Sequence, residues 1–221
     1  MLKFYYNTRS PMARRVWRFL LEKDIPFEPI LMNLNGDQMQ RKYLQLNPFH
    51  HIPVIVDGDF RLIESLAILD YLEAKYPTPA LLPTDIKALG TVRMVQMVST
   101  NELLPKVISL IFDSEDSEKY VQANKHLPTV LQFLDTTLGK NDYFGGEQLS
   151  LADIVVGTDI SLLPKIGFSL NNYPQLHNWF ERLMQRKVWQ ETELSTEDYG
   201  QFKRVLNILR QRKSRLANNA M

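Results

Sequence analysis

The spacing of hydrophobic and polar residues divides the chain into a mixed first part and a helical second part. Residues 2–6, LKFYY, form an aromatic-rich run that predicts a short strand, and residues 10–24 follow with apolar side chains at helical spacing. Ser10 is a favourable N-cap for that helix, and Pro11 fits its first position, where a missing N–H costs nothing. We therefore expect a strand that leads directly into a helix.

The rest of the first part predicts a small α/β unit. Residues 26–34 predict a second strand, 36–48 a short helix and 65–76 a longer helix. Residues 53–58 and 60–64 predict two strands around an Asp-Gly-Asp turn, which is a hairpin pattern. The order βαβαββα predicts a parallel βαβ unit joined to a hairpin, with helices covering the sheet.

A proline-rich stretch separates this unit from the helical part. PTPALLPTD, residues 77–85, contains three prolines in nine residues and reads as a linker. We predict an α/β domain over residues 1–76, a linker over 77–84 and an all-helical domain over 85–221. The helical patterns in the second domain cover residues 85–112, 115–138, 150–166, 174–187 and a basic segment over about 195–216.

One helix start in the second domain has a clear capping pattern. Ser150 precedes Leu151 and is followed at the third position by Asp153, an S-x-x-D variant of the capping box. Leu149 and Ile154 can form a hydrophobic staple across the same turn. This pattern predicts a well-capped core helix and carries no chemistry.

Composition narrows the classes of protein. The 221 residues have a formal net charge of +1, which does not favour nucleic acid or a membrane surface as a partner. No apolar run approaches the roughly 18 residues of a spanning helix, and no secretory signal is visible, so we expect a cytoplasmic protein. The absence of cysteine excludes disulfides, zinc-thiolate sites and a cysteine nucleophile.

The segment 47–77 is the most informative about chemistry. The Ile52–Pro53 bond can adopt the cis form, and such a turn can leave the backbone N–H and C=O of Ile52 free to pair with an extended peptide. Glu64 and Ser65 stand at a helix start, where exposed N–H groups favour a carboxylate. Together these elements predict a site for a small peptide, held by its backbone and its α-carboxylate.

The residues of this segment carry a family resemblance. The ordered pattern NP...IPV...DG...L.ES.AI..YL...YP, with LSLADI and YPQLHNWFERL in the helical half, resembles the soluble glutathione transferases, with serine-type, theta- or zeta-like features. The resemblance covers residues 2–190. It implies a thioredoxin-like domain joined to an all-helical domain, glutathione as co-substrate without a further cofactor, and a homodimer.

The resemblance also assigns residues to the parts of glutathione. His51 and Ile52, with Pro53, match the positions that hold the cysteinyl part. Glu64 and Ser65 match those that hold the γ-glutamyl end. Gln38 falls where theta-like members place a polar side chain near the glycyl carboxylate, and Asn101 or Glu102 is where a residue can reach the neighbouring subunit's glutathione.

The central task of such a site is to stabilise a thiolate, because only the thiolate is an effective nucleophile. Lowering a thiol pKa from about 8.5 by two units requires roughly 2.7 kcal/mol. One charge-assisted hydrogen bond contributes about 1.5–3 kcal/mol, so a hydroxyl and a helix N-terminus together suffice. Ser10 has both, and it aligns with the family's catalytic serine through the pattern Ser-x-x-x-Arg, here Ser10 to Arg14.

Two other activators remain open. Tyr5 or Tyr6 is a rival, because YYNTRS can also be aligned with members that use a tyrosine. Arg9 is another, because a cation at this turn could lower the thiol pKa without any hydroxyl. The cysteine that many zeta-like members carry beside the serine is absent, with Pro11 and Met12 in that region, which argues against a zeta-type isomerase.

The electrophile site is expected between the domains. Methionine suits promiscuous apolar sites, although ordinary core packing is the competing interpretation for each candidate. The basic segment FKRVLNILRQRKSRL predicts a solvated helix face, with an anionic ligand or RNA as the alternative. The candidates for the apolar wall are Met12, Met94, Met97, Leu104 and Phe112.

The adjacent pair His50–His51 does not predict a metal site, because neighbouring residues on an extended chain point in opposite directions. The sequence therefore predicts a glutathione transferase acting on small hydrophobic electrophiles, with reduction of organic peroxides as a second activity. A non-catalytic binding or assembly protein of the same fold and a glutathione-dependent isomerase are the alternatives.

Overall fold

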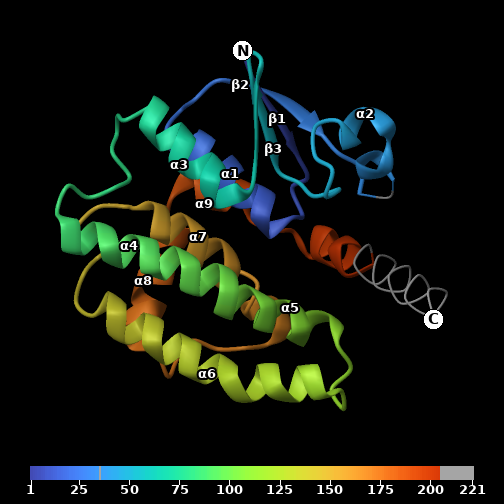
Figure 1. The fold of residues 1–221 in the computed structure, drawn as a ribbon. Coiled ribbons are helices and arrows are strands. Elements are labelled where there is room, and N and C mark those ends of the chain that lie inside the picture. Colours follow the sequence, from blue (N-terminus) through green and yellow to red (C-terminus); the bar gives the residue numbers. More distant parts are fainter. Residues whose placement is uncertain (35, 205–221) are drawn as a thin grey trace.

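The computed structural model describes residues 1–34 and 36–204 of the chain. Its first domain contains a four-stranded sheet in the order β2-β1-β3-β4 (Figure 1). β1 runs parallel to β2 and antiparallel to β3, and β3 and β4 form a hairpin. The predicted βαβ unit joined to a hairpin is confirmed. The strands are β1 (Leu2–Tyr6), β2 (Phe27–Leu31), β3 (Val54–Asp57) and β4 (Phe60–Ile63).

Three α-helices belong to this domain in the described part of the chain. α1 (Pro11–Glu22) begins directly after the Ser10 cap, as predicted, and α3 (Ser65–Lys75) follows the hairpin. The helix predicted over 36–48 is shorter in the structure, where a 3₁₀ turn (Asp37–Met39) precedes α2 (Arg41–Leu44). The two pieces are separate because the backbone at Gln40 is extended, with ψ 141°.

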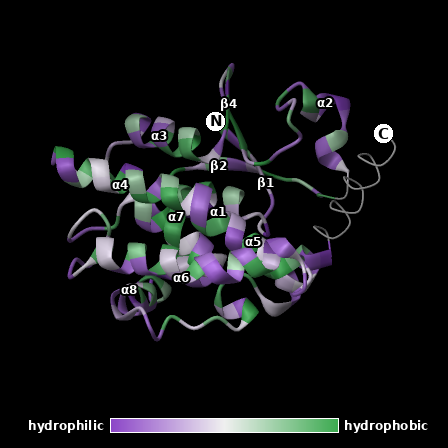
Figure 2. Ribbon diagram, turned by 60° about the horizontal axis from the view of Figure 1, so that its bottom comes forward, coloured by the Kyte–Doolittle hydropathy of each residue, from purple (hydrophilic) through white to green (hydrophobic). Residues whose placement is uncertain are grey.

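The second domain consists of helices joined by turns and loops, in the part of the chain that the structure describes. In Figure 2, α6 shows alternating bands of hydrophobic and hydrophilic residues, as expected for a helix with one face on the core. None of the described helices has the length and the apolar character needed to cross a membrane. The helices are α4 (Ile86–Val98), α5 (Leu104–Phe112), α6 (Glu118–Leu138), α7 (Leu151–Ile160), α8 (Pro174–Met184) and α9 (Lys187–Thr192).

Three predicted helix boundaries are wrong. The helix expected over 85–112 is divided by a π-helical turn at Ser99–Leu103, and Pro105, which has no N–H for the preceding turn, follows this widening. The helix expected over 150–166 ends at Ile160. The segment 174–187 ends one helix and begins another, because Arg186 is extended, with ψ 136°.

The predicted basic segment 195–216 lies mostly outside the described residues. Within them, residues 196–204 are helical.

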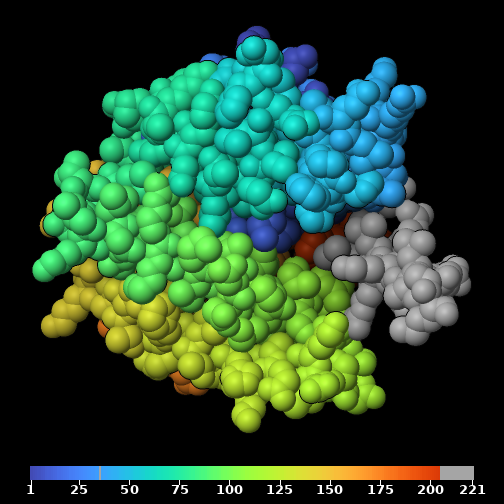
Figure 3. Space-filling view, in the orientation of Figure 1, coloured from blue at the N-terminus to red at the C-terminus, as the bar shows by residue number. Residues whose placement is uncertain are grey.

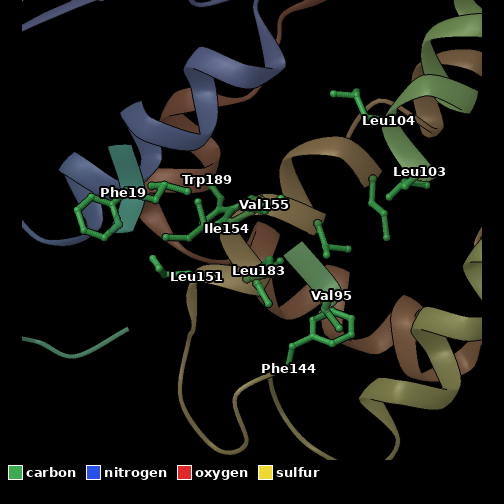
Figure 4. Close-up of a cluster of buried hydrophobic side chains, with 14 of the residues drawn as sticks. Phe19, Val95, Leu103, Leu104, Phe144, Leu151, Ile154, Val155, Leu183 and Trp189 are labelled. Atoms are coloured by element: carbon green, nitrogen blue, oxygen red, sulfur yellow. The ribbon is translucent and has the colours of Figure 1, made fainter. Parts of the chain in front are cut away.

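α7 forms the centre of the core. All ten of its residues are buried, and the capping box of Ser150 and Asp153 is present as predicted. Figure 4 shows Leu151, Ile154 and Val155 of this helix packed among side chains of both domains. Gly157 is required here, because a Cβ would lie 2.4 Å from the Trp189 ring.

Buried ion pairs fix α1 on the helical domain. Arg14, Arg15 and Arg18 have no exposed side-chain surface. The Nη2 atom of Arg15 lies 2.5 Å from Asp159 of α7, and Arg14 and Arg18 each lie 3.2 Å from Glu193. Because Ser10 is the cap of α1, these contacts also fix Ser10 relative to the second domain.

Candidate active site

A cavity of about 420 Å³ lies at the junction of the two domains. Figure 3 shows the surface hollowed where the blue N-terminal residues, the cyan segment and the green helices meet. Nine predicted site residues come together here: Ser10, Met12, Gln38, His51, Ile52, Pro53, Glu64, Ser65 and Leu104. Six residues that the sequence did not assign to the site line it as well: Pro11, Leu34, Asn47, His50, Ile108 and Phe202.

Ser10 is placed as the sequence predicts. Its Oγ accepts a hydrogen bond from the backbone N–H of Ala13 at 3.3 Å and thereby caps α1. Its backbone N–H donates to Asn7 at 3.1 Å, which fixes the turn. The cap uses Ser10 Oγ only as an acceptor, so the hydroxyl proton can be donated to a group in the cavity. An anion there would also benefit from the N-terminal end of α1.

Neither rival tyrosine lines this cavity. The Tyr5 ring packs near Tyr43, with centroids 6.1 Å apart, in a separate cluster of buried residues. Tyr6 stacks on Phe4 with centroids 4.6 Å apart. Burial raises the pKa of the Tyr6 phenol. Both rings therefore serve packing beside the sheet rather than presenting a hydroxyl to the cavity.

The other rival, Arg9, also lies outside the cavity wall. Its Nε donates to Oδ1 of Asp198 at 3.3 Å. Its backbone N–H donates to the Asn7 side chain at 2.9 Å. The positive charge of Arg9 is therefore paired with a carboxylate, which weakens the case for it as the activator of a thiol.

The turn before β3 presents free backbone groups. The Ile52–Pro53 bond is cis. The carbonyl of His51 accepts hydrogen bonds from the Tyr43 hydroxyl at 2.6 Å and from Asn47 Nδ2 at 2.8 Å, and burial raises the pKa of Tyr43. Within the described chain, no group bonds to the backbone N–H or C=O of Ile52. A peptide ligand could therefore pair with them as an added strand.

A second edge of the cavity is the start of α3. Glu64, the residue before the helix, has φ 69° and ψ 114°, a conformation that costs a residue with a side chain about 1–3 kcal/mol and is commonest at functional sites. Its carboxylate makes no capping hydrogen bond. Ser65 is the first helical residue, and its Oγ lies 3.6 Å from Met12 Sδ. This edge combines a carboxylate for a ligand ammonium with a helix N-terminus for a ligand carboxylate.

The polar end of the cavity also holds two imidazoles and an amide. His50 and His51 both line it, and the expectation that the pair lies on an extended chain is wrong, because His50 has φ 61°. Gln38 donates to the carbonyl of Leu34 at 2.9 Å, and its buried Oε1 has no partner among the described residues. Gln38 therefore offers an acceptor, which suits a peptide N–H better than a carboxylate.

No three acidic or histidine side chains of residues 1–34 and 36–204 converge as metal ligands.

The apolar end is formed mainly by residues of α5 and by Phe202. Leu104 and Ile108, one helical turn apart, line it together with Phe202. Phe112, expected in this wall, lies behind it and packs edge-on against Phe202, with centroids 5.5 Å apart. The spacing of Leu104 and Ile108 could have identified Ile108 from the sequence, whereas Phe202 has no such local signal.

Met94 and Met97 are not part of this wall. They lie on α4 and are 43% and 51% exposed. The π-helical turn after α4 separates their helix from α5, which supplies the wall instead. Their helical spacing in the sequence could not distinguish a cavity wall from an outer surface.

Comparison with known proteins gives matches over both domains. The family model "Glutathione S-transferase, N-terminal domain" matches residues 4–80, and "Glutathione S-transferase, C-terminal domain" matches residues 85–187. The chain is 30% identical over 207 residues to glutathione S-transferase hmp2 of Hypomyces subiculosus, with 86% of this chain and 96% of that protein covered.

Two further relatives extend the comparison. Glutathione S-transferase D7 of Drosophila melanogaster is 30% identical over 223 residues, with 97% of each chain covered. The crystal structure of a diazinon-metabolizing glutathione S-transferase of the silkworm Bombyx mori is similar with a TM-score of 0.81 at 25% identity. That comparison covers 92% of this chain and 99% of the silkworm chain.

Proposed function

The chain belongs to the glutathione S-transferase family and is a glutathione transferase; from that premise we propose that it conjugates the glutathione thiolate to small hydrophobic electrophiles, with Ser10 as the activating group. One observation carries the proposal. A single cavity is lined by the Ser10 hydroxyl, by two edges suited to a peptide and by an apolar wall. The class within the family stays a prediction.

Glutathione fits the two polar edges in one orientation. The backbone of its cysteinyl residue pairs with the free N–H and C=O of Ile52. Its γ-glutamyl ammonium meets the Glu64 carboxylate, while its α-carboxylate meets Ser65 and the start of α3. His50, His51 and Gln38 are left at the polar end for the glycyl residue. This orientation brings the cysteinyl sulfur toward Ser10.

The thiolate requires a lowered pKa. A hydrogen bond from the Ser10 hydroxyl to the charged sulfur contributes about 1.5–3 kcal/mol, and the N-terminus of α1 adds about 0.3–1 kcal/mol. Their sum is enough for the roughly 2.7 kcal/mol that a two-unit shift requires. No buried cation is needed, which agrees with the pairing of Arg9 and Asp198.

The electrophile occupies the apolar end. Met12, Leu104, Ile108 and Phe202 offer polarisable and aliphatic contacts without a charged group, which suits small apolar molecules of varied shape. Reduction of organic peroxides is a second activity of the same thiolate. The isomerase alternative has less support, because Pro11 and Met12 occupy the region where many zeta-like members carry cysteine.

The experiment is a substrate panel at fixed glutathione concentration. Isothiocyanates, aryl halides, epoxides and hydroperoxides are assayed, together with a maleylacetoacetate-type compound for the isomerase alternative. We expect turnover of at least one of the first three classes. Retention on immobilised glutathione with no turnover of any compound would favour the non-catalytic alternative instead.

We further propose a homodimer. Met94 and Met97 leave an apolar strip on the outer side of α4, and two-fold pairing is the commonest assembly of such chains. Asn101 follows on the π-helical turn and is exposed, so it is the better candidate to reach a neighbour's glutathione. Glu102 is paired with Lys106 at 2.7 Å, which lowers the pKa of Glu102. The cytoplasmic location stays a prediction.

A further inference from the structure

Arg9 directly precedes Ser10, yet its side chain contacts the C-terminal segment, residues 195–204, rather than the cavity. Figure 1 shows this segment in red beside the start of α1. We propose that the Arg9–Asp198 ion pair is a positioning contact that holds the C-terminal segment at the turn before α1, so that Phe202 closes the apolar end of the cavity. This inference rests on the proposed function and identifies a residue that sets affinity for the electrophile.

Asp198 is oriented by the start of its own helix. Its backbone N–H donates to Ser195 Oγ at 3.0 Å, and the Ser195 hydroxyl donates to Asp198 Oδ2 at 2.8 Å. The other carboxylate oxygen, Oδ1, accepts from Arg9. Ser195 therefore caps the helix of residues 196–204, and the Asp198 carboxylate joins that cap to the residue before Ser10.

Phe202 lies four residues after Asp198, so the two side chains share one face of the helix. Phe202 is 3% exposed and lines the cavity with Leu104 and Ile108. One turn of helix therefore connects the ion pair to the cavity wall.

The neighbouring contacts show why this pair matters. Upstream, the chain is fixed by Glu193, which meets Arg14 and Arg18 of α1. Lys165 also donates to the carbonyl of Leu194 at 2.9 Å. Across residues 195–204, as far as the structure describes the chain, Arg9–Asp198 is the one ion pair.

The expected effect is moderate, because the side chains of Arg9 and Asp198 are 26% and 39% exposed. Ion pairs with this exposure shift an equilibrium by about 1.4- to 5-fold. A role in activating the thiol would instead change the pKa of bound glutathione. The two roles therefore predict different measurements.

The experiment compares Arg9→Gln, Asp198→Asn and the double variant with an aryl halide as electrophile. We expect the KM for the electrophile to rise about 1.4- to 5-fold in each single variant and no further in the double. The thiolate absorbance of bound glutathione should titrate as in the wild type. Arg93→Gln is the matched control, because Arg93 forms an ion pair with Asp70 that also joins the two domains but lies outside the cavity wall. The side chains of Arg93 and Asp70 are 38% and 47% exposed. This variant should leave the KM for the electrophile unchanged.

Amide hydrogen exchange tests the same contact without any turnover. Exchange of residues 195–204 should increase in Arg9→Gln and stay unchanged in Arg93→Gln. If the wild type turns over no electrophile, the proposed function fails while this measurement still decides the positioning role. Any of three results would overturn the inference. The first is a raised pKa of the glutathione thiol in Arg9→Gln with an unchanged KM for the electrophile. The others are additive effects on that KM in the double variant, or unchanged amide exchange of residues 195–204 in Arg9→Gln.

Discussion

Nη2 of Arg15 and Oδ2 of Asp159 lie 2.5 Å apart, and neither side chain has any exposed surface. The pair joins α1 of the first domain to α7 of the second. Asp159 Oδ2 also accepts from Ser99 at 2.8 Å, while its Oδ1 and the Arg15 Nε have no partner within residues 1–34 and 36–204. Each charge is therefore balanced mainly by the other, and removal of one partner leaves a buried charge without compensation.

Asp159→Leu should lower the free energy of unfolding by about 3–5 kcal/mol, because Arg15 is then left charged in the core. Adding Arg15→Met should recover much of that loss, since an apolar pair of similar volume needs no desolvated charge. Urea unfolding of the wild type, both single variants and the double variant measures this. A double variant less stable than Asp159→Leu would show that the charges themselves are needed.

Ser10→Ala should raise the pKa of bound glutathione by about one to two units, because the thiolate loses one hydrogen bond. Turnover at neutral pH should fall about 10- to 100-fold if chemistry limits the rate. Glutathione affinity at low pH should change little, since the thiol is then protonated in both proteins. Thiolate absorbance against pH is the measurement.

Tyr5→Phe is the matched control for Ser10→Ala, because Tyr5 is a rival hydroxyl that lies outside the cavity wall. It should titrate as the wild type does. Loss of the α1 cap in Ser10→Ala costs about 1 kcal/mol, so a small fall in Tm is expected in any case. An upward shift in Tyr5→Phe, with Ser10→Ala unchanged, would transfer the role to the tyrosine.

Ser65→Ala should weaken glutathione binding about 10- to 100-fold, because a hydrogen bond to a charged carboxylate contributes about 1.5–3 kcal/mol. The thiol pKa of glutathione, once bound, should stay unchanged, since Ser65 is assigned to the γ-glutamyl end. Titration calorimetry gives the Kd. Thr91→Ala, on the exposed side of α4, is the control and should leave it unchanged. Equal affinity in Ser65→Ala and wild type would reject the proposed orientation.

Burial raises the pKa of Asp153 to about 6 from 3.8, although Ser150, Phe144 N–H and Trp179 donate hydrogen bonds to it. The folded protein therefore binds this proton more tightly than the unfolded chain. The resulting stabilisation is complete below pH 3.8 and is lost as pH rises through about 6. Between pH 5 and 7 it changes by about 1 kcal/mol.

Asp153→Asn removes this titration. The difference in unfolding free energy, wild type minus variant, should therefore be about 1 kcal/mol larger at pH 5 than at pH 7. Urea unfolding at the two pH values measures it. Asp116→Asn, at an exposed position, is the control. Its difference from the wild type in unfolding free energy should be the same at pH 5 and pH 7. A difference that shrinks at pH 5 would contradict the raised pKa.

Met97→Glu should dissociate the proposed homodimer, because it places a charge in the apolar strip on α4. Sedimentation at micromolar concentration should show twice the 25.8 kDa chain mass for the wild type and the chain mass for the variant. Val121→Glu is the control, since Val121 is 50% exposed on α6, and it should stay dimeric. A wild type that sediments at the single-chain mass would reject the dimer.

The sequence by itself determined the features that depend on neighbouring residues. The strand-to-helix junction at Ser10, the hairpin after Pro53 and the capping box at Ser150 follow from turns, caps and periodicity, which act over a few positions. The ordered motif around Ile52 and Glu64 indicated the family, because it too is a pattern of residues that lie close together in the sequence. These parts of the fold and of the candidate site could be predicted.

Only the tertiary structure decided which side chains face the cavity. Arg9 and Asp198 are 189 positions apart, and Ile108 of α5 meets Phe202 in one wall only through the tertiary packing of the helical domain. Helical spacing marked Met97 and Leu104 as equal candidates, yet the π-helical turn between α4 and α5 leaves one outside and one in the wall. Local preferences set each element, whereas the direction of a side chain depends on contacts between elements that are distant in the sequence.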